Sequence, residues 1–431
     1  MLIRAVLALA LAMIAGCATH RDSREEFGAL QREFLAQYES LRIPEFGRAY
    51  LENVEGIGSA EALAERSRFF SQWHSRLVAL SRNGLDRAVR PRYDTLLFEI
   101  EFNLERARLE GRYAQARPTS IPADGLSKLP DAQFWYALYL RRNASREIAP
   151  EALFAFAEAE VARIRGEMGR IQGKLGYAGR DGEWRERLRA QVVADPAEVA
   201  RRFAQVRDTV QAALPRYFDS ANVSPPPIRP APNPTKDTPP GYYMDGAFYF
   251  NVFGGQFAER SFGWLYLHEA MPGHHYQQSL HPDPPSSSGF WYPAYVEGWG
   301  AYCEDLGSEL GLYANPDLHY GKWEWDLVRS ARVAIDVGIH YKGWRRDQAL
   351  GYWYANVPGQ EEIALREVDR ITRWPTQVVS YKVGESAMLE LKADLARRQG
   401  GLFDVRAFHA RLLGLGAVPI SVLERALRES A

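Results

Sequence analysis

The segment Leu267–Gln278, LHEAMPGHHYQQ, contains the residue types of a hydrolytic metal site. Such a site needs three protein ligands, an open position for water and a carboxylate that takes a proton from that water. In the common sequence form, two histidines lie four residues apart on one helix and a glutamate follows the first. His268 and Glu269 fit the first ligand and the base, but Pro272 occupies the position of the second histidine.

Two histidines follow the proline, at His274 and His275. In an unbroken helix, His274 would lie about 240° around the axis from His268, and His275 about 10 Å along it. Pro272 and Gly273 interrupt a helix, so the segment MPG is predicted to be an inserted loop that returns one of the two histidines to the metal. The alternative is that the helix ends here and that both histidines lie on the surface.

A third ligand is available in the aromatic segment Tyr292–Asp305, where Glu297 lies 23 residues after His274. On a helix, Glu297, Ala301 and Glu304 would share one face. We expect Glu297 to bind the metal and Ala301 to leave room on that face. Glu304 would orient a ligand histidine through a hydrogen bond. The alternative is an amphipathic surface helix, but the segment is too aromatic for that.

Arg332, Asp336 and His340 recur at four-residue intervals in the apolar segment RSARVAIDVGIHYKGW. A buried aspartate beside a histidine would fix the ring tautomer and raise the histidine pKa. His340 could then donate to the oxyanion of a tetrahedral intermediate. The alternative is a structural ladder that ties helices together.

Tyr381 is a second candidate for stabilising an oxyanion. It precedes Gly384, where the next helix is predicted to open, so its hydroxyl would lie on a loop.

Helices are expected to position most of these residues, because apolar side chains recur at three- and four-residue spacing along most of the chain. The predicted helices cover residues 61–82, 93–113, 150–176, 259–271, 295–311, 322–343, 345–356, 361–373 and 385–399. One convincing strand is predicted, at Gly246–Phe253. The predicted fold class is therefore mainly α with a small sheet.

The segment Asn222–Gly241 is too rich in proline for a helix or a central strand. It is either a flexible linker or an extended segment laid across one domain. We expect a helical N-terminal region at residues 24–220 and a catalytic region at residues 221–431, and we expect the two to form one compact unit.

The N-terminus reads as a bacterial lipoprotein signal. Residues 1–16 are a predicted signal peptide, whose apolar run is too short for a stable membrane span. The run ends in IAGC, which resembles a lipobox, so Cys17 is predicted to be lipidated and residues 17–23 to form a tether. Ala18 rather than an aspartate follows, which favours the outer membrane of a Gram-negative cell, with the protein facing the periplasm. The alternative is an ordinary signal peptide with a chance cysteine.

The composition is that of a soluble globular protein, with 46% hydrophobic and 25% charged residues and a net charge of −1. Nothing in this balance indicates a nucleic-acid partner. With Cys17 acylated, the other cysteine, Cys303, has no disulfide partner and is expected to be a buried small residue. The oligomeric state is left open.

Together these motifs resemble the domain-of-unknown-function 885 family of bacterial proteins, which are often predicted to be lipoproteins. The resemblance rests on HEAMPGHHYQ, YVEGWGAYCEDLG, RVAIDVGIHYKGW and QVVSYKVGESAMLELK in that order. A weaker match, AEAEVARIRGEMGRIQGKLGYAG, extends it over about residues 157–392.

The resemblance implies a fold, because the family is grouped with the gluzincin zinc peptidases. It implies a largely helical catalytic domain whose small sheet borders the active-site cleft. AFYFNV would be an edge strand that pairs with extended peptide. The family pattern PGH favours His274 over His275 as the second ligand, and the gluzincin spacing favours Glu297 as the third.

The sequence therefore predicts a membrane-anchored zinc peptidase with His268, His274 and Glu297 as metal ligands. Glu269 would act as the base, and His340 and Tyr381 would stabilise the oxyanion. Two alternatives are a metal-dependent hydrolase of another amide or ester and a non-catalytic envelope lipoprotein that binds peptide.

Overall fold

Helices make up most of the chain in the computed structural model, which describes residues 24–116, 118–219, 223–235, 238–280 and 290–429. The chain divides into two compact units. Of the described residues, the first comprises those up to Ile121 together with Phe290, and the second comprises those from Pro122 to Leu280 and from Trp291 to Glu429. The division therefore lies about 100 residues before the boundary expected near residue 220. The predicted signal peptide, tether and lipidation site, Cys17, lie outside the described residues.

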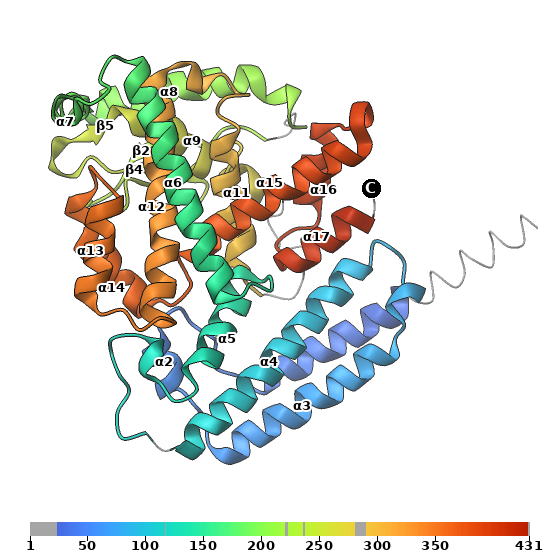
Figure 1. Cartoon of the computed structure of the whole chain (residues 1–431). Helices are drawn as coiled ribbons and strands as arrows, with labels where there is room; N and C mark the ends of the chain where they lie inside the picture. The colour runs from blue at the N-terminus through green and yellow to red at the C-terminus, as the bar shows by residue number, and fades with distance from the viewer. Residues whose placement is uncertain (1–23, 117, 220–222, 236–237, 281–289, 430–431) are drawn as a thin grey trace, which may run out of the picture. The chain divides into compact units, whose positions relative to one another are not determined.

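The first unit consists of helices (Figure 1), and their aromatic side chains form its core. Residues 24–40 are helical, and α2 (Tyr50–Glu55), α3 (Ala60–Ala79) and α4 (Arg90–Ala116) follow. The side chain of Ser59 accepts the N–H of Ala62, which satisfies one of the free donors at the start of α3. The core is made by Phe27, Phe34, Phe70, Trp73, Leu77, Leu85, Val89, Tyr93, Leu96 and Ile100.

The second unit contains the candidate catalytic residues and metal ligands. Its helices are α5 (Ala132–Ala144), α6 (Pro150–Lys174), α7 (Asp181–Ala190), α8 (Pro196–Ala213), α9 (Phe262–Glu269), α10 (His274–Leu280), α11 (Pro293–Asp305), α12 (Pro316–His340), α13 (Arg346–Asn356), α14 (Ala364–Arg373), α15 (Val379–Gln399), α16 (Val405–Gly414) and α17 (Ile420–Glu429). Its strands are β1 (Val192–Val193), β2 (Ile228–Pro230), β3 (Gly241–Met244), β4 (Ala247–Phe250) and β5 (Phe257–Ala258). Eight single-turn 3₁₀ helices lie between these elements in the described chain, η1 (Arg82–Gly84) in the first unit and, in the second, η2 (Leu126–Lys128), η3 (Leu214–Arg216), η4 (Phe253–Gly255), η5 (Glu259–Ser261), η6 (Leu312–Ala314), η7 (Glu361–Ile363) and η8 (Gly400–Leu402).

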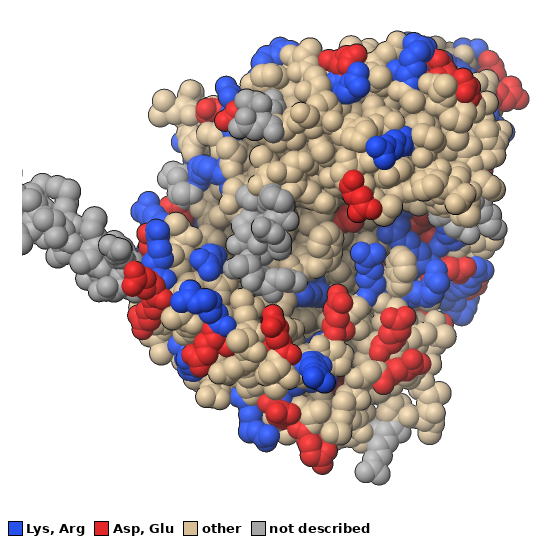
Figure 2. Space-filling view, turned by 180° about the vertical axis from the view of Figure 1, so that it is seen from behind, with Lys and Arg blue, Asp and Glu red and all other residues tan. Residues whose placement is uncertain are grey.

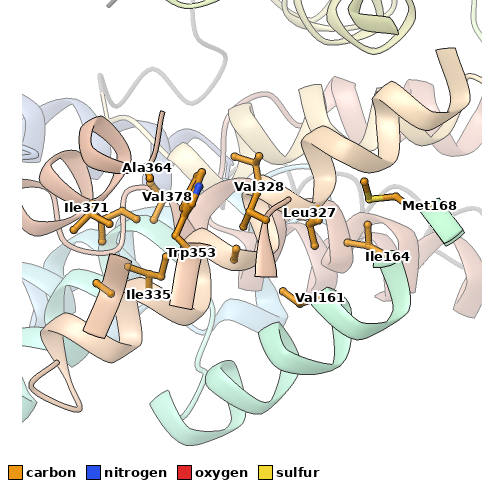
Figure 3. Close-up of a cluster of buried hydrophobic side chains, with 14 of the residues drawn as sticks. Val161, Ile164, Met168, Leu327, Val328, Ile335, Trp353, Ala364, Ile371 and Val378 are labelled. Carbon is orange, nitrogen blue, oxygen red and sulfur yellow. The ribbon is translucent and has the colours of Figure 1, made fainter. Parts of the chain in front are cut away.

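Helix α12 is the central helix of the second unit, and from residue 326 to its end every side chain is buried. Its apolar residues pack against α6 on one side and against α13 and α14 on another (Figures 1 and 3). The labelled core residues in Figure 3 are Val161, Ile164, Met168, Leu327, Val328, Ile335, Trp353, Ala364, Ile371 and Val378. Polar side chains on this helix must therefore find partners inside the protein.

The predicted strand is β4, but it does not lie at an edge. The three-stranded sheet has the order β2-β4-β3, with β2 parallel and β3 antiparallel to β4. The prediction that AFYFNV is an edge strand is therefore wrong, because both of its sides are already paired. The proline-rich segment supplies β2 as one edge, where the missing N–H of Pro230 is tolerated.

No helix in the described part of the chain is long and apolar enough to cross a membrane. Acidic and basic side chains lie among one another in Figure 2, and a broad area of the visible face carries few of either.

Two glycines allow α11 and α15 to cross at very short distance. A Cβ on Gly298 would lie 2.4 Å from the Cα of Gly384. A Cβ on Gly384 would lie 1.9 Å from the carbonyl oxygen of Ala294. Any side chain at either position would force the two helices apart, and with them the residues that they contribute to the site.

We therefore predict that Gly384→Ala lowers the stability of the protein by about 1–3 kcal/mol, the usual cost of overpacking a close contact. The matched control is Gly166→Ala, on an exposed face of α6, where a Cβ would meet nothing within 4 Å. Gly166→Ala should leave stability unchanged or raise it, since alanine is the better helix former. Calorimetric unfolding of both variants tests this, and equal melting temperatures would contradict it.

Candidate metal centre

The chain turns sharply between the two halves of the histidine motif. Helix α9 ends at Glu269, and α10 begins at His274. A Cβ on Gly273 would lie 1.9 Å from the carbonyl oxygen of His268, so the connection folds tightly back on the end of α9 and requires glycine. The segment MPG is thus the inserted loop that the sequence predicts.

This turn brings three of the predicted ligands together. Nε2 of His268 lies 3.7 Å from Oε2 of Glu297 on α11, and Nε2 of His274 lies 3.5 Å from the same oxygen. The ligand atoms of the three residues all lie within 4.8 Å of one another. The exposed fractions of the His268, His274 and Glu297 side chains are 6%, 12% and 20%, so the cluster is largely buried but can be reached.

The geometry of this cluster fits a zinc ion. Zinc holds nitrogen and oxygen ligands at about 2.0–2.2 Å in a tetrahedron, which places the ligand atoms about 3.4 Å apart. Both measured separations to Glu297 are close to that value. Two imidazoles and one carboxylate also form a ligand set found in catalytic zinc sites, where the fourth position is left for water.

His275 faces away from this cluster. Its Nε2 lies 2.8 Å from the carbonyl oxygen of Ser224, and its Nδ1 lies 3.3 Å from the hydroxyl of Tyr243. Both ring nitrogens therefore have protein partners. Of the two adjacent histidines, His274 is the one that the fold brings to His268 and Glu297.

Glu304 holds the ring of His268 in place, as the spacing on α11 predicts. Its Oε1 lies 2.7 Å from Nδ1 of His268, which leaves Nε2 facing Glu297. Arg329 of α12, also fully buried, donates from Nη1 to Oε2 of Glu304 at 2.7 Å and from Nη2 to Oε1. Arg329 was missed by the sequence analysis, although it opens the segment in which Arg332 was singled out.

The charges of these groups depend strongly on one another. Burial alone would lower the pKa of His268, but Glu297 and Glu304 raise that pKa to about 9. Burial alone would raise the pKa of Glu297, but His268 and His274 hold it well below its usual range. The ligand carboxylate is therefore ionised at neutral pH, as metal binding requires.

Glu269 lies at the end of α9, beside the sheet. Its Oε2 accepts the backbone N–H of Tyr243 on β3 at 3.0 Å. Burial raises the pKa of Glu269, while the neighbouring His268 and His274 lower it in part. A half-buried carboxylate with a raised pKa beside a metal cluster has the properties of a general base.

Gly300 provides the space for the His268 ring. A Cβ on Gly300 would lie 2.6 Å from Cε1 and 2.8 Å from both nitrogens of that ring. The sequence analysis expected a small residue on this helix to leave room, but it chose Ala301, one position further along.

Tyr381 lies next to the cluster but not on a loop. Helix α15 begins at Val379, six residues earlier than predicted, so Tyr381 belongs to its first turn. Its ring is nearly parallel to that of His268, with 6.3 Å between the ring centroids. Burial and the charge of Glu297 raise the pKa of Tyr381, so the phenol keeps its proton at neutral pH and can donate it in a hydrogen bond.

His340 does not belong to this site. It lies eleven residues after Arg329 on α12, about 16 Å further along the helix. Its Nδ1 accepts the N–H of Leu126 at 3.1 Å, and its Nε2 donates to the carbonyl oxygen of Ile371 at 2.8 Å. Burial lowers its pKa to about 4. The predicted oxyanion role is wrong, because both nitrogens serve the backbone.

Asp336 does not pair with His340 either. Its carboxylate accepts the N–H of Thr376 at 2.7 Å and the hydroxyl of Tyr136 at 2.9 Å. Arg332 donates instead to Glu367 at 2.9 Å. The three residues share one face of α12, but each bonds to a different neighbour, which corresponds to the structural alternative.

We predict that Glu304→Gln weakens zinc binding about 10- to 100-fold, because His268 loses the carboxylate that orients its ring. Competition with a zinc chelator measures this affinity. The matched control is Glu309→Gln, since Glu309 follows α11 and its side chain is 39% exposed. Equal zinc affinities for the folded variants would show that Glu304 does not support the metal.

The comparisons with known proteins give a family and a fold. The chain matches the family described as "Bacterial protein of unknown function (DUF885)" over residues 55–427. No curated protein matches it significantly.

Among the solved structures that are similar to the chain are two described as lipoproteins. The "putative lipoprotein from Colwellia psychrerythraea" is 24% identical, with a TM-score of 0.65, over 88% of this chain and 68% of that chain. The "putative lipoprotein of unknown function from Shewanella oneidensis" is 17% identical, with a TM-score of 0.68, over 96% of this chain and 99% of that chain. Because the family match spans most of its length, the chain belongs to the DUF885 family, as its motifs indicate.

Proposed function

We propose that this protein is a zinc-dependent peptidase of the gluzincin type. The observation that carries the proposal is the meeting of His268, His274 and Glu297, with ligand atoms within 4.8 Å of one another, directly beside Glu269. Three ligands, an adjacent carboxylate base and a buried partner for the first histidine are what a hydrolytic zinc site requires.

Zinc bound to these three residues would lower the pKa of a water molecule and polarise the carbonyl of the substrate. Glu269 takes the proton from the attacking water and passes it to the nitrogen of the leaving amine. Burial raises the pKa of Glu269, which makes its carboxylate a stronger proton acceptor for the attacking water.

Tyr381 stabilises the negative charge on the former carbonyl oxygen. Its phenol is protonated at neutral pH, and its charged neighbours are Glu297, Arg370 and Arg332. The two arginines favour negative charge near this hydroxyl. Since His340 is committed to the backbone, Tyr381 is the candidate oxyanion donor that the chain retains.

The position of β3 favours a peptide over another amide or ester. Strand β3 is an edge of the sheet, and the N–H of Tyr243 points away from β4 to Glu269. A peptide laid along this edge would pair its backbone with β3 and pass the carboxylate of Glu269. Strand β3 thus takes the role that the sequence analysis gave to β4.

We also propose that the protein is a lipoprotein of the cell envelope, facing the periplasm and anchored through Cys17. The support is the sequence IAGC at the end of an apolar run, together with the descriptions of the two similar structures as lipoproteins. Sorting to the outer membrane is proposed from Ala18 alone.

We predict that Glu269→Gln retains stoichiometric zinc but lowers kcat on peptides by a factor of about 10² to 10⁴, the usual contribution of a general base. Metal content is measured on the purified protein, and cleavage is followed on a peptide mixture by mass spectrometry. The matched control is Glu259→Gln, since Glu259 forms an ion pair with Arg202 before α9 begins. The control should keep full activity.

Removal of zinc by a chelator should abolish cleavage in the wild type, and added zinc should restore it. Cleavage that survives in Glu269→Gln would exclude the role given to that residue. A zinc-loaded wild type that cleaves no peptide but cleaves other amides or esters would favour the broader hydrolase, and binding of peptide without any cleavage would favour the non-catalytic lipoprotein.

A further inference from the structure

Arg370 on α14 is a cation whose protein partners do not balance its charge. The nearby carboxylate, Glu367, is taken by Arg332, which reaches it at 2.8 Å, and by Arg366, at 3.2 Å. The corresponding distance from Nη1 of Arg370 is 3.9 Å. Arg370 donates a short hydrogen bond to a neutral group, Oε1 of Gln377, at 2.7 Å, and the side chain of Tyr381 also lies within hydrogen-bond reach of it.

The guanidinium also has capacity to bind a further group. Its Nε has no hydrogen-bond partner within the described chain, and 23% of the side chain is exposed. A buried donor without a partner is costly, so such atoms in native proteins commonly face a ligand, an ion or water. The planar fork of a guanidinium matches the two oxygens of a carboxylate.

Arg370 lies on the Tyr381 side of the metal centre. Gln377, its hydrogen-bond partner, precedes Tyr381 by four residues at the start of α15. Burial alone would lower the pKa of Arg370, but Tyr381, Glu367 and Glu297 together raise it, so the guanidinium is within electrostatic reach of both the oxyanion candidate and a metal ligand.

We propose that Arg370 binds a carboxylate of the peptide substrate near the scissile bond. This inference rests on the proposed peptidase function and extends it to substrate choice. The carboxylate could be the C-terminus, which would make the enzyme act at chain ends, or an acidic side chain, which would make it selective for sequence. Both sources present the same two oxygens to the same guanidinium.

The test measures binding and needs no cleavage. Zinc-loaded Glu269→Gln protein is titrated calorimetrically with N-acetyl-Ala-Ala-Ala and with its C-terminal amide. A second pair is N-acetyl-Ala-Asp-Ala amide and N-acetyl-Ala-Asn-Ala amide. We expect the charged member of one pair to bind at least about tenfold more tightly than its neutral analogue, as for a hydrogen-bonded charge. The pair that discriminates identifies the source of the carboxylate.

The same titrations on the double variant Glu269→Gln, Arg370→Gln should lose that discrimination. The matched control is Arg373→Gln, because Arg373 lies on the same helix, is exposed and faces the same Trp374 ring at a similar distance, 5.8 Å against 5.7 Å for Arg370. The control should keep the discrimination. If Arg370→Gln does not fold, Gln377→Glu replaces it, since a carboxylate at that position would occupy the guanidinium and should have the same effect.

Two results would overturn the inference. One is equal binding of the charged and neutral peptides in both pairs. The other is discrimination that persists in a folded Arg370→Gln protein. The outcome is separate from the fate of the proposed function, because wild-type protein that discriminates between the peptides but cleaves none would leave the carboxylate site standing and remove the peptidase.

Discussion

The buried carboxylate of Glu304 is the group on which the architecture of the site depends. It has no exposed surface, and it joins His268 of α9 and Arg329 of α12 to its own helix, α11. A charge in this position is tolerable only when its hydrogen bonds are complete, because its desolvation costs several kcal/mol. The relative placement of three helices is therefore tied to the orientation of one imidazole. The Arg329 side chain neutralises the charge of Glu304, so the pair adds no net charge to the metal cluster.

Much of the fold could be predicted because the signals are local. Apolar periodicity predicted the long helices, and the loop at MPG followed from the backbone restrictions of Pro272 and Gly273. The pairing of Glu304 with a ligand histidine also followed from helix geometry, since Glu304 lies two turns after Glu297 on the same face. The structure shows that this histidine is His268. The boundaries were less predictable, and α15 begins before Gly384 because that glycine serves a helix crossing rather than a helix start.

The remaining features could not be predicted because they depend on which element packs opposite. Asp336 and His340 have the spacing of a hydrogen-bonded pair. Instead, Asp336 accepts the N–H of Thr376 and His340 accepts the N–H of Leu126, and both donors belong to other segments. Nothing in the sequence separates Arg329 from Arg332 as a candidate, since both lie in the same apolar segment. Arg329 supports the site because it lies opposite Glu304 of α11, whereas Arg332 bonds to Glu367. The composition of strand β4 is compatible with an edge strand and with a central strand. It is central because the proline-rich β2 pairs with its second side. The spacing of residues on a helix shows which of them lie on one face, but it does not show which residues of other elements contact that face.

The charges around the cluster differ between its two sides, with carboxylates beside the ligand histidines and arginines near Tyr381. With Glu304 neutralised by Arg329, the carboxylates left beside the two ligand histidines are Glu297 and Glu269. A divalent cation would balance these carboxylates once it has displaced the protons of the two imidazoles. Within the described chain, the basic side chains at ion-pair distance from Glu297 are His268 and His274. On the Tyr381 side the balance reverses, because Arg332 and Arg370 both lie near Tyr381 and share the carboxylate of Glu367. In the proposed reaction, the negative charge of the transition state would develop between the metal and these two arginines, and both would stabilise it.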